Sequence, residues 1–231
     1  MGVVAVYANN EEFKSVKKEI KNGMVSPYSY VLAKTILEIP LMFAFALCAL
    51  GVPAYLVTNF APEGFGIMML LWAVSIYCWE AISEVLAVSF DNPLMGVMQF
   101  MGIWFSAFLY GGFLIPGEDM VWPLKIFFYI MPIKYTVRSM VYTDFHFSEY
   151  DSCDKSKYRN ELCFGEYNQK KNDGDEVLDG INNVYPLITS KDYSWEDVGV
   201  LLAMAVLYKA MYVGIIIMKS KQVTTIKPHS S

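Results

Sequence analysis

Four apolar segments, each long enough to cross a bilayer, constrain the fold of this chain more than any other feature. They cover residues 35–57, 66–90, 93–115 and 198–218. A helix needs about 20 apolar residues to cross a hydrocarbon core ~30 Å thick. Each segment is apolar on all sides rather than along one stripe, which argues against a soluble helical domain. Only 18% of the residues are charged, below the roughly 25% typical of soluble domains. We therefore predict an all-α integral membrane protein with four full spans.

A fifth apolar segment, residues 121–142, differs from the four spans because prolines and cations interrupt it. Pro123 and Pro132 break its helical periodicity. Its three cations are Lys125, Lys134 and Arg138. Non-helical backbone at membrane depth is tolerated only where protein or water covers it. We therefore expect re-entrant or interfacial helices over about 120–143, followed by a long loop over 144–197.

The placement of lysines predicts which side of the membrane each part of the chain occupies. Four spans bring both termini to the same side. Lysines gather before the first span and after the last one, whereas the turn "TNFAPEGFG" between the first two spans has no Lys or Arg. By the positive-inside rule, both termini, including a tail over 219–231, are predicted to be cytoplasmic. Residues 116–197 are then predicted to lie outside, with 31–218 forming the transmembrane domain.

Residues 1–30, before the first span, contain a short apolar run and an amphipathic pattern. The run "GVVAVYA" is too short to span and is interpreted as the end of a preceding span. The next stretch, "NNEEFKSVKKEIKNG", begins with two capping residues and ends at Gly23. It places Phe13, Val16 and Ile20 at helical spacing. We expect a cytoplasmic helix that starts near Asn9 and lies at the membrane surface.

Motifs for catalysis, metal binding and nucleic-acid binding are not found. The sequence contains no G-x-x-x-x-G-K-[ST], no H-E-x-x-H and no G-x-S-x-G. His146 and His229 belong to no metal-ligand spacing. No Lys/Arg-rich run with interleaved aromatics is present. We expect a chain that is not itself an enzyme, holds no metal or cofactor and has no nucleic-acid partner.

The four cysteines fall into two groups. Cys48 and Cys78 lie within predicted spans and are interpreted as small core residues. Cys153 and Cys163 lie together in the loop predicted to be outside. In an oxidising compartment they would form a disulfide, and two free thiols are the alternative.

Two glutamates, Glu80 and Glu84, lie within the second span and share one helical face. A charge at mid-bilayer costs several kcal/mol and usually has a partner. Lys209 lies at a depth similar to that of Glu80, so we hypothesise that these two residues pair. Glu38 enters from the cytoplasmic side, nearer the depth of Glu84. The four form a predicted polar network, which either fixes helix register or conducts protons or cations.

The order of features resembles the C-terminal part of the transmembrane domain of an ABCG/White-type ATP-binding-cassette exporter, the ABC-2 membrane fold. Beyond a Tyr-Lys pair in "LYK" (207–209), four longer stretches carry this resemblance. They are "EFKSVKKEIKNGMVSPYSYVLAKTILEIP" (12–40), "NPLMG" (92–96), "FLYGGFLIP" (108–116) and "WPLKIFFYIMPIKYTVRSMVYTDF" (122–145).

The resemblance implies an exporter of lipophilic or amphipathic substrates in the plasma membrane. ATP and Mg would act through a nucleotide-binding domain that this chain does not contain, and a second transmembrane half would form a homo- or heterodimer with it. The alternative is an ATP-independent membrane protein, either a proton-coupled carrier or a non-transporting scaffold.

The resemblance also assigns roles to residues. Substrate contacts fall at Met101, Phe105 and Phe108, and an outer constriction falls at Phe113 and Leu114. The helix near the N-terminus becomes either a lever that touches the nucleotide-binding domain or a plain linker on lipid headgroups. The residues assigned to such a coupling helix are Glu12, Phe13, Val16 and Glu19.

Overall fold

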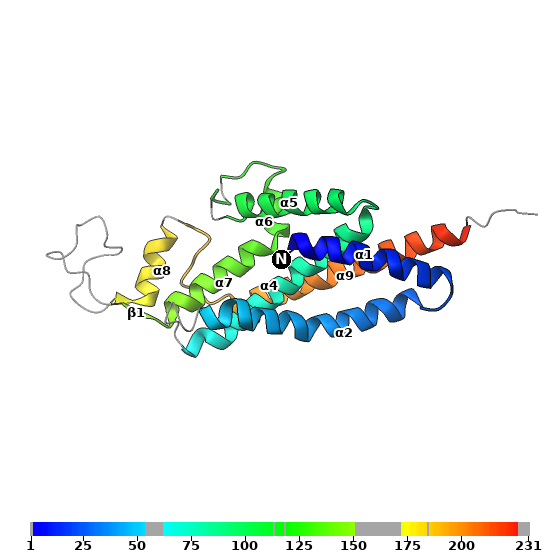
Figure 1. Ribbon diagram of the computed structural model, residues 1–231. Coiled ribbons are helices and arrows are strands. Elements are labelled where there is room, and N and C mark those ends of the chain that lie inside the picture. The colour runs from blue at the N-terminus through cyan, green and yellow to red at the C-terminus, as the bar shows by residue number, and fades with distance from the viewer. Residues whose placement is uncertain are drawn as a thin grey trace, which may run out of the picture.

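The computed structural model describes residues 2–53, 62–112, 114–117, 119–150, 172–183 and 185–225. Its helices, in chain order, are α1 (Gly2–Lys21), α2 (Pro27–Ala46), the π-helical turn η1 (Leu47–Gly51), α4 (Pro62–Ser89), α5 (Pro93–Tyr110), α6 (Lys125–Ile130), α7 (Pro132–His146), α8 (Gly174–Asn182) and α9 (Ser194–Thr225). Two short antiparallel strands, β1 (Glu149–Tyr150) and β2 (Asn172–Asp173), precede α8. Figure 1 shows an elongated bundle with α7 and α8 toward one end and the end of α9 toward the other.

The prediction of four spans in a helical membrane protein is confirmed. Within the described ranges, four helical segments are long and apolar enough to cross a membrane. They are Pro27–Gly51, Pro62–Ser89, Pro93–Tyr110 and Ser194–Lys219.

The structure moves three boundaries relative to the predicted spans. The helix of the first span, α2, begins at Pro27 rather than near 35, because Ser26 is extended and proline suits the first helical turn. The helix of the third span ends at Tyr110 rather than 115, where Gly112 has a φ of 89° that only glycine adopts readily. The last helix continues past 218, to Thr225.

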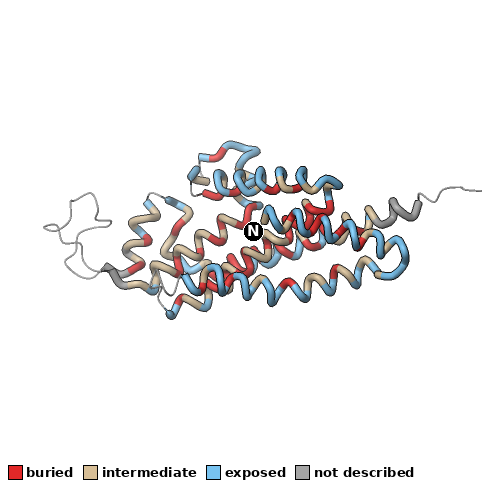
Figure 2. The backbone as a smooth tube through the Cα atoms, viewed as in Figure 1, coloured by how far each residue is buried: buried red, intermediate tan, exposed pale blue. Residues whose placement is uncertain are grey.

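Helix α4 is the centre of the bundle. It packs against α1, α2, α5, α7 and α9. Figure 2 shows its tube mostly in the buried colour, whereas α2 and α5 are largely exposed. Both Glu80 and Glu84 therefore lie on the helix that the other helices surround.

Helix α1 is continuous from Gly2, so the expected start of a separate helix near Asn9 is wrong. The side chains of Asn9 and Asn10 do not cap α1 but bond to other helices. Asn10 donates to the carbonyls of Ala87 and Phe90, at 2.7 and 2.8 Å, and so satisfies carbonyl groups at the end of α4. The predicted end at Gly23 agrees with the structure.

The end of α1 is a Schellman motif. The Gly23 N–H bonds to the Ile20 carbonyl at 3.0 Å, and the Met24 N–H bonds to the Glu19 carbonyl at 3.1 Å. Gly23 has a φ of 72°, the left-handed conformation that this motif requires. The chain therefore reverses sharply, and α2 runs back alongside α1 (Figure 1).

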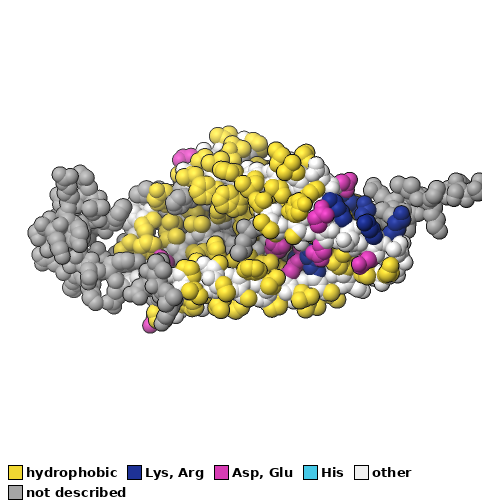
Figure 3. All heavy atoms as spheres, viewed as in Figure 1, with side chains coloured by type: hydrophobic (Ala, Val, Ile, Leu, Met, Phe, Trp, Pro, Cys, Tyr) yellow, Lys and Arg dark blue, Asp and Glu magenta, His cyan; other side chains and the backbone are white. Residues whose placement is uncertain are grey.

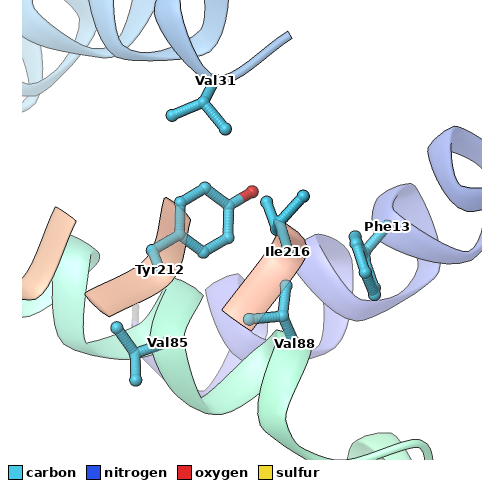
Figure 4. Packing of buried hydrophobic residues seen from close by; sticks show 6 residues of the cluster. All are labelled: Phe13, Val31, Val85, Val88, Tyr212 and Ile216. Carbon is cyan, nitrogen blue, oxygen red and sulfur yellow. The ribbon is translucent and has the colours of Figure 1, made fainter. Parts of the chain in front are cut away.

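A hydrophobic cluster joins four helices at the inner face of α1. Figure 4 shows its members in the region where these helices meet: Phe13 from α1, Val31 from α2, Val85 and Val88 from α4, and Tyr212 and Ile216 from α9. All six are buried. Burying a large apolar side chain contributes about 1.5–3 kcal/mol. The cluster therefore fixes α1 against the spans rather than leaving it free on lipid headgroups.

Residues 120–150 form a broken helical segment, as expected for 120–143. α6 ends at Ile130, Met131 is extended, and Pro132 begins α7. Arg138 of α7 makes a bidentate ion pair with the fully buried Asp197 in the first turn of α9, and Ser139 also donates to that carboxylate. The segment 144–197, which was predicted to be a long loop, includes α8 and the start of α9. Cys153 and Cys163 lie outside the described residues.

Candidate functional site

Five charged residues meet where α1, α2, α4 and α9 come together. We call this set the charge cluster: Glu12, Lys34, Glu38, Glu84 and Lys209. Figure 3 shows acidic and basic side chains gathered at the end of the molecule where α1 turns into α2, in contrast to the apolar surface over α5. The cluster therefore links the helix before the first span to three of the spans.

Lys209 of α9 occupies the inner part of the charge cluster. Its ammonium donates to the carboxylates of Glu38 on α2 and Glu84 on α4. All three side chains are buried, and Glu84 is 0% exposed. The ammonium also lies 5.3 Å from the ring centre of Tyr77, within range of a cation–π interaction. One cation therefore joins three spans.

Lys34 of α2 occupies the outer part of the charge cluster and connects it to α1. Its ammonium donates to Glu12 Oε2 and to Asn9 Oδ1, each at 2.8 Å. It also lies 3.7 Å from Glu84 Oε1 and 3.9 Å from Glu38 Oε1. The same lysine thus contacts carboxylates from α1, α2 and α4.

Glu12 is the member of the charge cluster that comes from α1. Its second oxygen accepts a hydrogen bond of 2.7 Å from the Tyr30 hydroxyl. Partial burial by itself would raise the pKa of this carboxyl, but the bonds from Lys34 and Tyr30 outweigh burial and lower the pKa below its ordinary value. Glu12 is therefore ionised at neutral pH and holds the end of α1 to the start of α2.

The hypothesis that Lys209 pairs with Glu80 is wrong. The side chain of Glu80 instead accepts a bond of 3.0 Å from Asn9 Nδ2, and Lys209 binds Glu38 and Glu84. Counting residues along the spans could not decide between two carboxylates that share one helical face and lie about 6 Å apart in depth, because that choice depends on how α9 is placed against α4. Glu80 joins the charge cluster only indirectly, through Asn9, which also accepts from Lys34.

The charges in the cluster are nearly balanced. Three carboxylates face two ammonium groups, and each ammonium contacts more than one carboxylate. A buried charge without a partner costs several kcal/mol, so removing either cation would leave an uncompensated carboxylate inside the bundle. The charge cluster can hold four helices in one register. If it stays intact when α1 moves, the other three helices must move with α1.

Sequence reasoning missed Lys34, Asn9 and Tyr30 as members of this site. Lys34 and Glu38 have the i, i+4 spacing that marks a helical ion pair, so this spacing could have identified Lys34. Asn9 and Tyr30 had no such signal, because their contacts depend on α1 folding back against α2 and α4.

The residues assigned to a coupling helix divide between the two faces of α1. Phe13 and Val16 are buried against the spans, and Glu12 belongs to the charge cluster. Glu19 is exposed. Any surface that α1 offers to another domain therefore lies on its outer face, beside exposed lysines such as Lys14 and Lys18.

The residues assigned to substrate contacts share one exposed face of α5. Met101, Phe105 and Phe108 are 41%, 55% and 39% exposed. Trp104 lies between the two phenylalanines and stacks on Phe108, with the ring centres 6.0 Å apart. Figure 3 shows the surface of this helix as a continuous apolar area. Leu114 lies past the end of α5 and is half exposed, and Phe113 lies outside the described residues.

Comparisons with known proteins agree with this architecture. The family model described as "ABC-2 type transporter" matches residues 2–145. The chain is 26% identical over 216 residues to ABC transporter G family member 23 of Arabidopsis thaliana, covering 92% of this chain and 32% of that protein. It is 27% identical over 206 residues to ABC transporter G family member 1 of Petunia hybrida, covering 87% of this chain and 29% of that protein.

The chain thus spans about a third of the length of the relatives that it matches. The matched region contains α1, the charge cluster residues of α2 and α4, the exposed face of α5 and nearly all of the broken segment α6–α7. From this match and its four membrane-spanning helices, the chain belongs to the ABC-2 type transporter family.

Proposed function

We propose that this chain is the membrane-spanning part of an ABCG-like exporter that moves lipophilic or amphipathic molecules across a membrane. The energy would come from ATP and Mg bound to a nucleotide-binding domain on another part of the complete transporter. The G-family names of two relatives and the match to the ABC-2 family support this proposal. The observation that carries it is the charge cluster.

The charge cluster supports transport because it mechanically connects a helix outside the spans to the spans themselves. Glu12 on α1 binds Lys34 on α2, and Lys34 lies beside the carboxylates that hold Lys209 of α9. A push on α1 is therefore transmitted to α2, α4 and α9 as a unit. Rigid-body movement of packed helices is how ABC-type and other transporters can expose a site alternately to each side.

The outer face of α1 is the surface that we assign to the nucleotide-binding domain. Glu19 and several lysines of α1 are exposed there, whereas the apolar face of α1 is already buried. In this arrangement the lysine-rich end of the bundle and both termini are cytoplasmic, in accordance with the positive-inside rule. The plasma membrane is the location that we propose for the complete transporter.

The exposed face of α5 is the surface that we assign to substrate and to a second transmembrane half. Its large apolar side chains, Met101, Phe105 and Phe108, are only partly covered by the described part of this chain. Two such faces related by a two-fold axis would enclose an apolar cavity suited to flat lipophilic molecules. The outer limit of that cavity would lie near Phe113 and Leu114, just beyond the end of α5.

The test is transport by the chain reconstituted into liposomes together with a nucleotide-binding domain of a G-type ABC transporter. We expect ATP-dependent, vanadate-sensitive movement of a lipophilic fluorescent dye. Replacing Phe105 or Phe108 with Ala should weaken the apparent affinity for the dye by roughly tenfold, from the loss of an aromatic contact. Leu207→Ala is the matched control, because Leu207 is exposed on α9, away from α5.

Two results would overturn the proposal. Dye movement that follows a pH gradient and ignores vanadate would show a proton-coupled carrier. A properly folded reconstituted chain that neither moves dye nor stimulates ATP hydrolysis would show a scaffold.

A further inference from the structure

A small cavity lies between α6, α7 and the stretch that leads into α9, and none of its lining residues belongs to the charge cluster or to α5. It has a volume of about 270 Å³. It is lined by Gly117, Lys125, Phe128, Tyr129, Lys134, Arg138, Pro186, Leu187, Thr189 and Tyr193. The volume is below the roughly 300–1,000 Å³ of pockets that hold whole drug-sized ligands, so it suits a headgroup rather than a large molecule.

The lining of this cavity is strongly cationic. Three of the lining residues carry a positive charge, and no residue of the lining carries a carboxylate. The guanidinium of Arg138 already binds Asp197, and it lies 4.4 Å from the ring centre of Tyr193. An arginine has five N–H donors in a planar fork, so this pairing leaves donors for another acceptor.

Lys134 is the most buried cation of the lining, with 8% of the residue exposed. Within the described ranges, the contacts of its ammonium are with aromatic rings and not with a carboxylate. Its ammonium is instead enclosed by aromatic rings, at 3.9 Å from the centre of Phe128, 4.6 Å from Tyr129 and 5.1 Å from Tyr135. Cation–π contacts hold the ammonium in place but use none of its three N–H donors.

A second lining residue also has an unused polar group. The Thr189 hydroxyl is buried and has no hydrogen-bond partner in the described part of the chain. Buried polar groups are nearly always paired, because an unpaired one has given up its bonds to water without replacing them. The Thr189 hydroxyl and the Lys134 ammonium line the same cavity, so one ligand that accepts hydrogen bonds would satisfy both groups.

We propose that this cavity binds the anionic headgroup of an amphiphile, a phosphate or carboxylate, with Lys134 as its main contact. The ammonium of Lys134 and the free donors of Arg138 bind the anion, and Thr189 adds a hydroxyl donor. The aromatic and aliphatic lining, which includes Phe128 and Leu187, contacts the first carbons of the attached chain. This proposal does not depend on transport, so it can be tested whether or not the exporter proposal holds.

The experiment measures binding of phosphatidic acid to the chain in neutral phosphatidylcholine nanodiscs. Phosphatidic acid should raise the thermal unfolding temperature in a concentration-dependent way, from which an apparent Kd is obtained. Lys134→Met keeps the length and apolar stem of the side chain but removes the charge, and should weaken binding by roughly tenfold or more. Lys191→Met is the matched control, because Lys191 is exposed in the same part of the chain but does not line the cavity. Its Kd should be unchanged.

Two further variants keep the test decisive if Lys134→Met does not fold. Lys134→Arg retains the charge and should retain binding, whereas Thr189→Val removes only the hydroxyl and should weaken binding severalfold. Equal Kd values for the unmodified chain and the Lys134 and Thr189 variants would overturn the proposal, and would show that Lys134 is held only for packing.

Competition distinguishes the two sources of such an anion. Inorganic phosphate should fail to displace phosphatidic acid at concentrations near the lipid's Kd, because it lacks the apolar part. Displacement by inorganic phosphate at equal concentration would overturn the amphiphile assignment and would assign the cavity to a small free anion. A soluble short-chain phosphatidic acid should compete, which would show that a free amphiphile as well as a bilayer lipid can enter.

Discussion

The charge cluster and the exposed face of α5 are opposite solutions to placing side chains in a membrane bundle. In the charge cluster, Glu38, Glu84 and Lys209 are buried at a depth where lipid would reject them, and each of the three is ion-paired with a residue from a neighbouring helix. On α5, apolar groups that lipid or another protein would accept remain exposed. The difference shows that the contacts within this chain are concentrated at α4, whereas α5, like α2, keeps much of its apolar surface open to other molecules.

This difference also underlies the two roles proposed above. The polar contacts fix the relative positions of α1, α2, α4 and α9, so they are suited to transmitting movement. The apolar face of α5 makes no comparable fixed contacts, so it is suited to substrates of varied shape and to a second half. Changes in the two regions should therefore affect different measurements.

The largest effect is expected from Lys209→Met. This change leaves the buried carboxylates of Glu38 and Glu84 without their shared cation. Removing one partner of a buried ion pair costs about 3–5 kcal/mol, so the free energy of unfolding in detergent should fall by that amount. Denaturant unfolding followed by circular dichroism is the measurement.

Lys219→Met is the control for that change, since Lys219 makes its ion pair with the exposed Asp91 and otherwise donates a long bond of 3.3 Å to the Ser89 carbonyl. Loss of such a surface pair costs less than about 1 kcal/mol. Equal losses for the two lysine variants would contradict the role given to the charge cluster.

A smaller effect is expected from α5, and it depends on which face is changed. Phe100 is 5% exposed and packs with Val6 and Ile82, whereas Phe105 is 55% exposed. Phe100→Ala should cost about 3 kcal/mol through loss of burial and the cavity left behind. Phe105→Ala should cost less than about 1 kcal/mol, because most of that side chain contacts no other part of the chain.

Thermal unfolding of the isolated chain measures this pair of variants. The substrate assay should show the reverse order, with the larger effect for Phe105→Ala. If Phe105→Ala destabilised the isolated chain as much as Phe100→Ala, the α5 face would be part of the core and not an outward-facing surface.

The sequence predicted the spans well because about 20 apolar residues in a row have few other structures open to them. It placed Glu38, Glu84 and Lys209 in one polar network, since ionisable groups at membrane depth must find partners. It did not predict which glutamate binds Lys209, because Glu80 and Glu84 lie on one face of α4, only one turn apart, and the choice depends on how α9 is placed along and around α4. That relative placement is set by packing in the clusters around Val85 and Ile82, which a sequence alone does not show.

The sequence also misplaced the start of the first cytoplasmic helix. Two asparagines in a row resemble a helix cap, and caps are local signals. Here the side chains of Asn9 and Asn10 bond instead to Glu80, Ala87 and Phe90, in α4 and just after its end. These contacts can be seen only in the tertiary structure. The cavity around Lys134 was hidden for the same reason, because its residues come from three separated parts of the chain.

The smallest effect is expected at the edge of the charge cluster, where Glu12 attaches α1. The side chain of Glu12 is about half exposed, so Glu12→Gln should lower stability by only about 0.5–1 kcal/mol. Because the pKa of Glu12 is lowered in the folded protein, its contribution is present above the ordinary value of 4.5 and is lost as the pH falls through the lowered value. The stability difference between the unmodified chain and Glu12→Gln should therefore shrink toward zero in acid.

Glu19→Gln is the matched control for this change, since Glu19 is exposed on the same helix and lies outside the charge cluster. If the charge cluster transmits movement from α1, Glu12→Gln should reduce ATP-dependent dye export far more than it reduces stability. Glu19→Gln should leave stability unchanged, and any loss of export would instead come from weaker contact with the nucleotide-binding domain. An export rate unaffected by Glu12→Gln would limit the charge cluster to a structural role, because the bond between α1 and α2 would then be unnecessary for coupling.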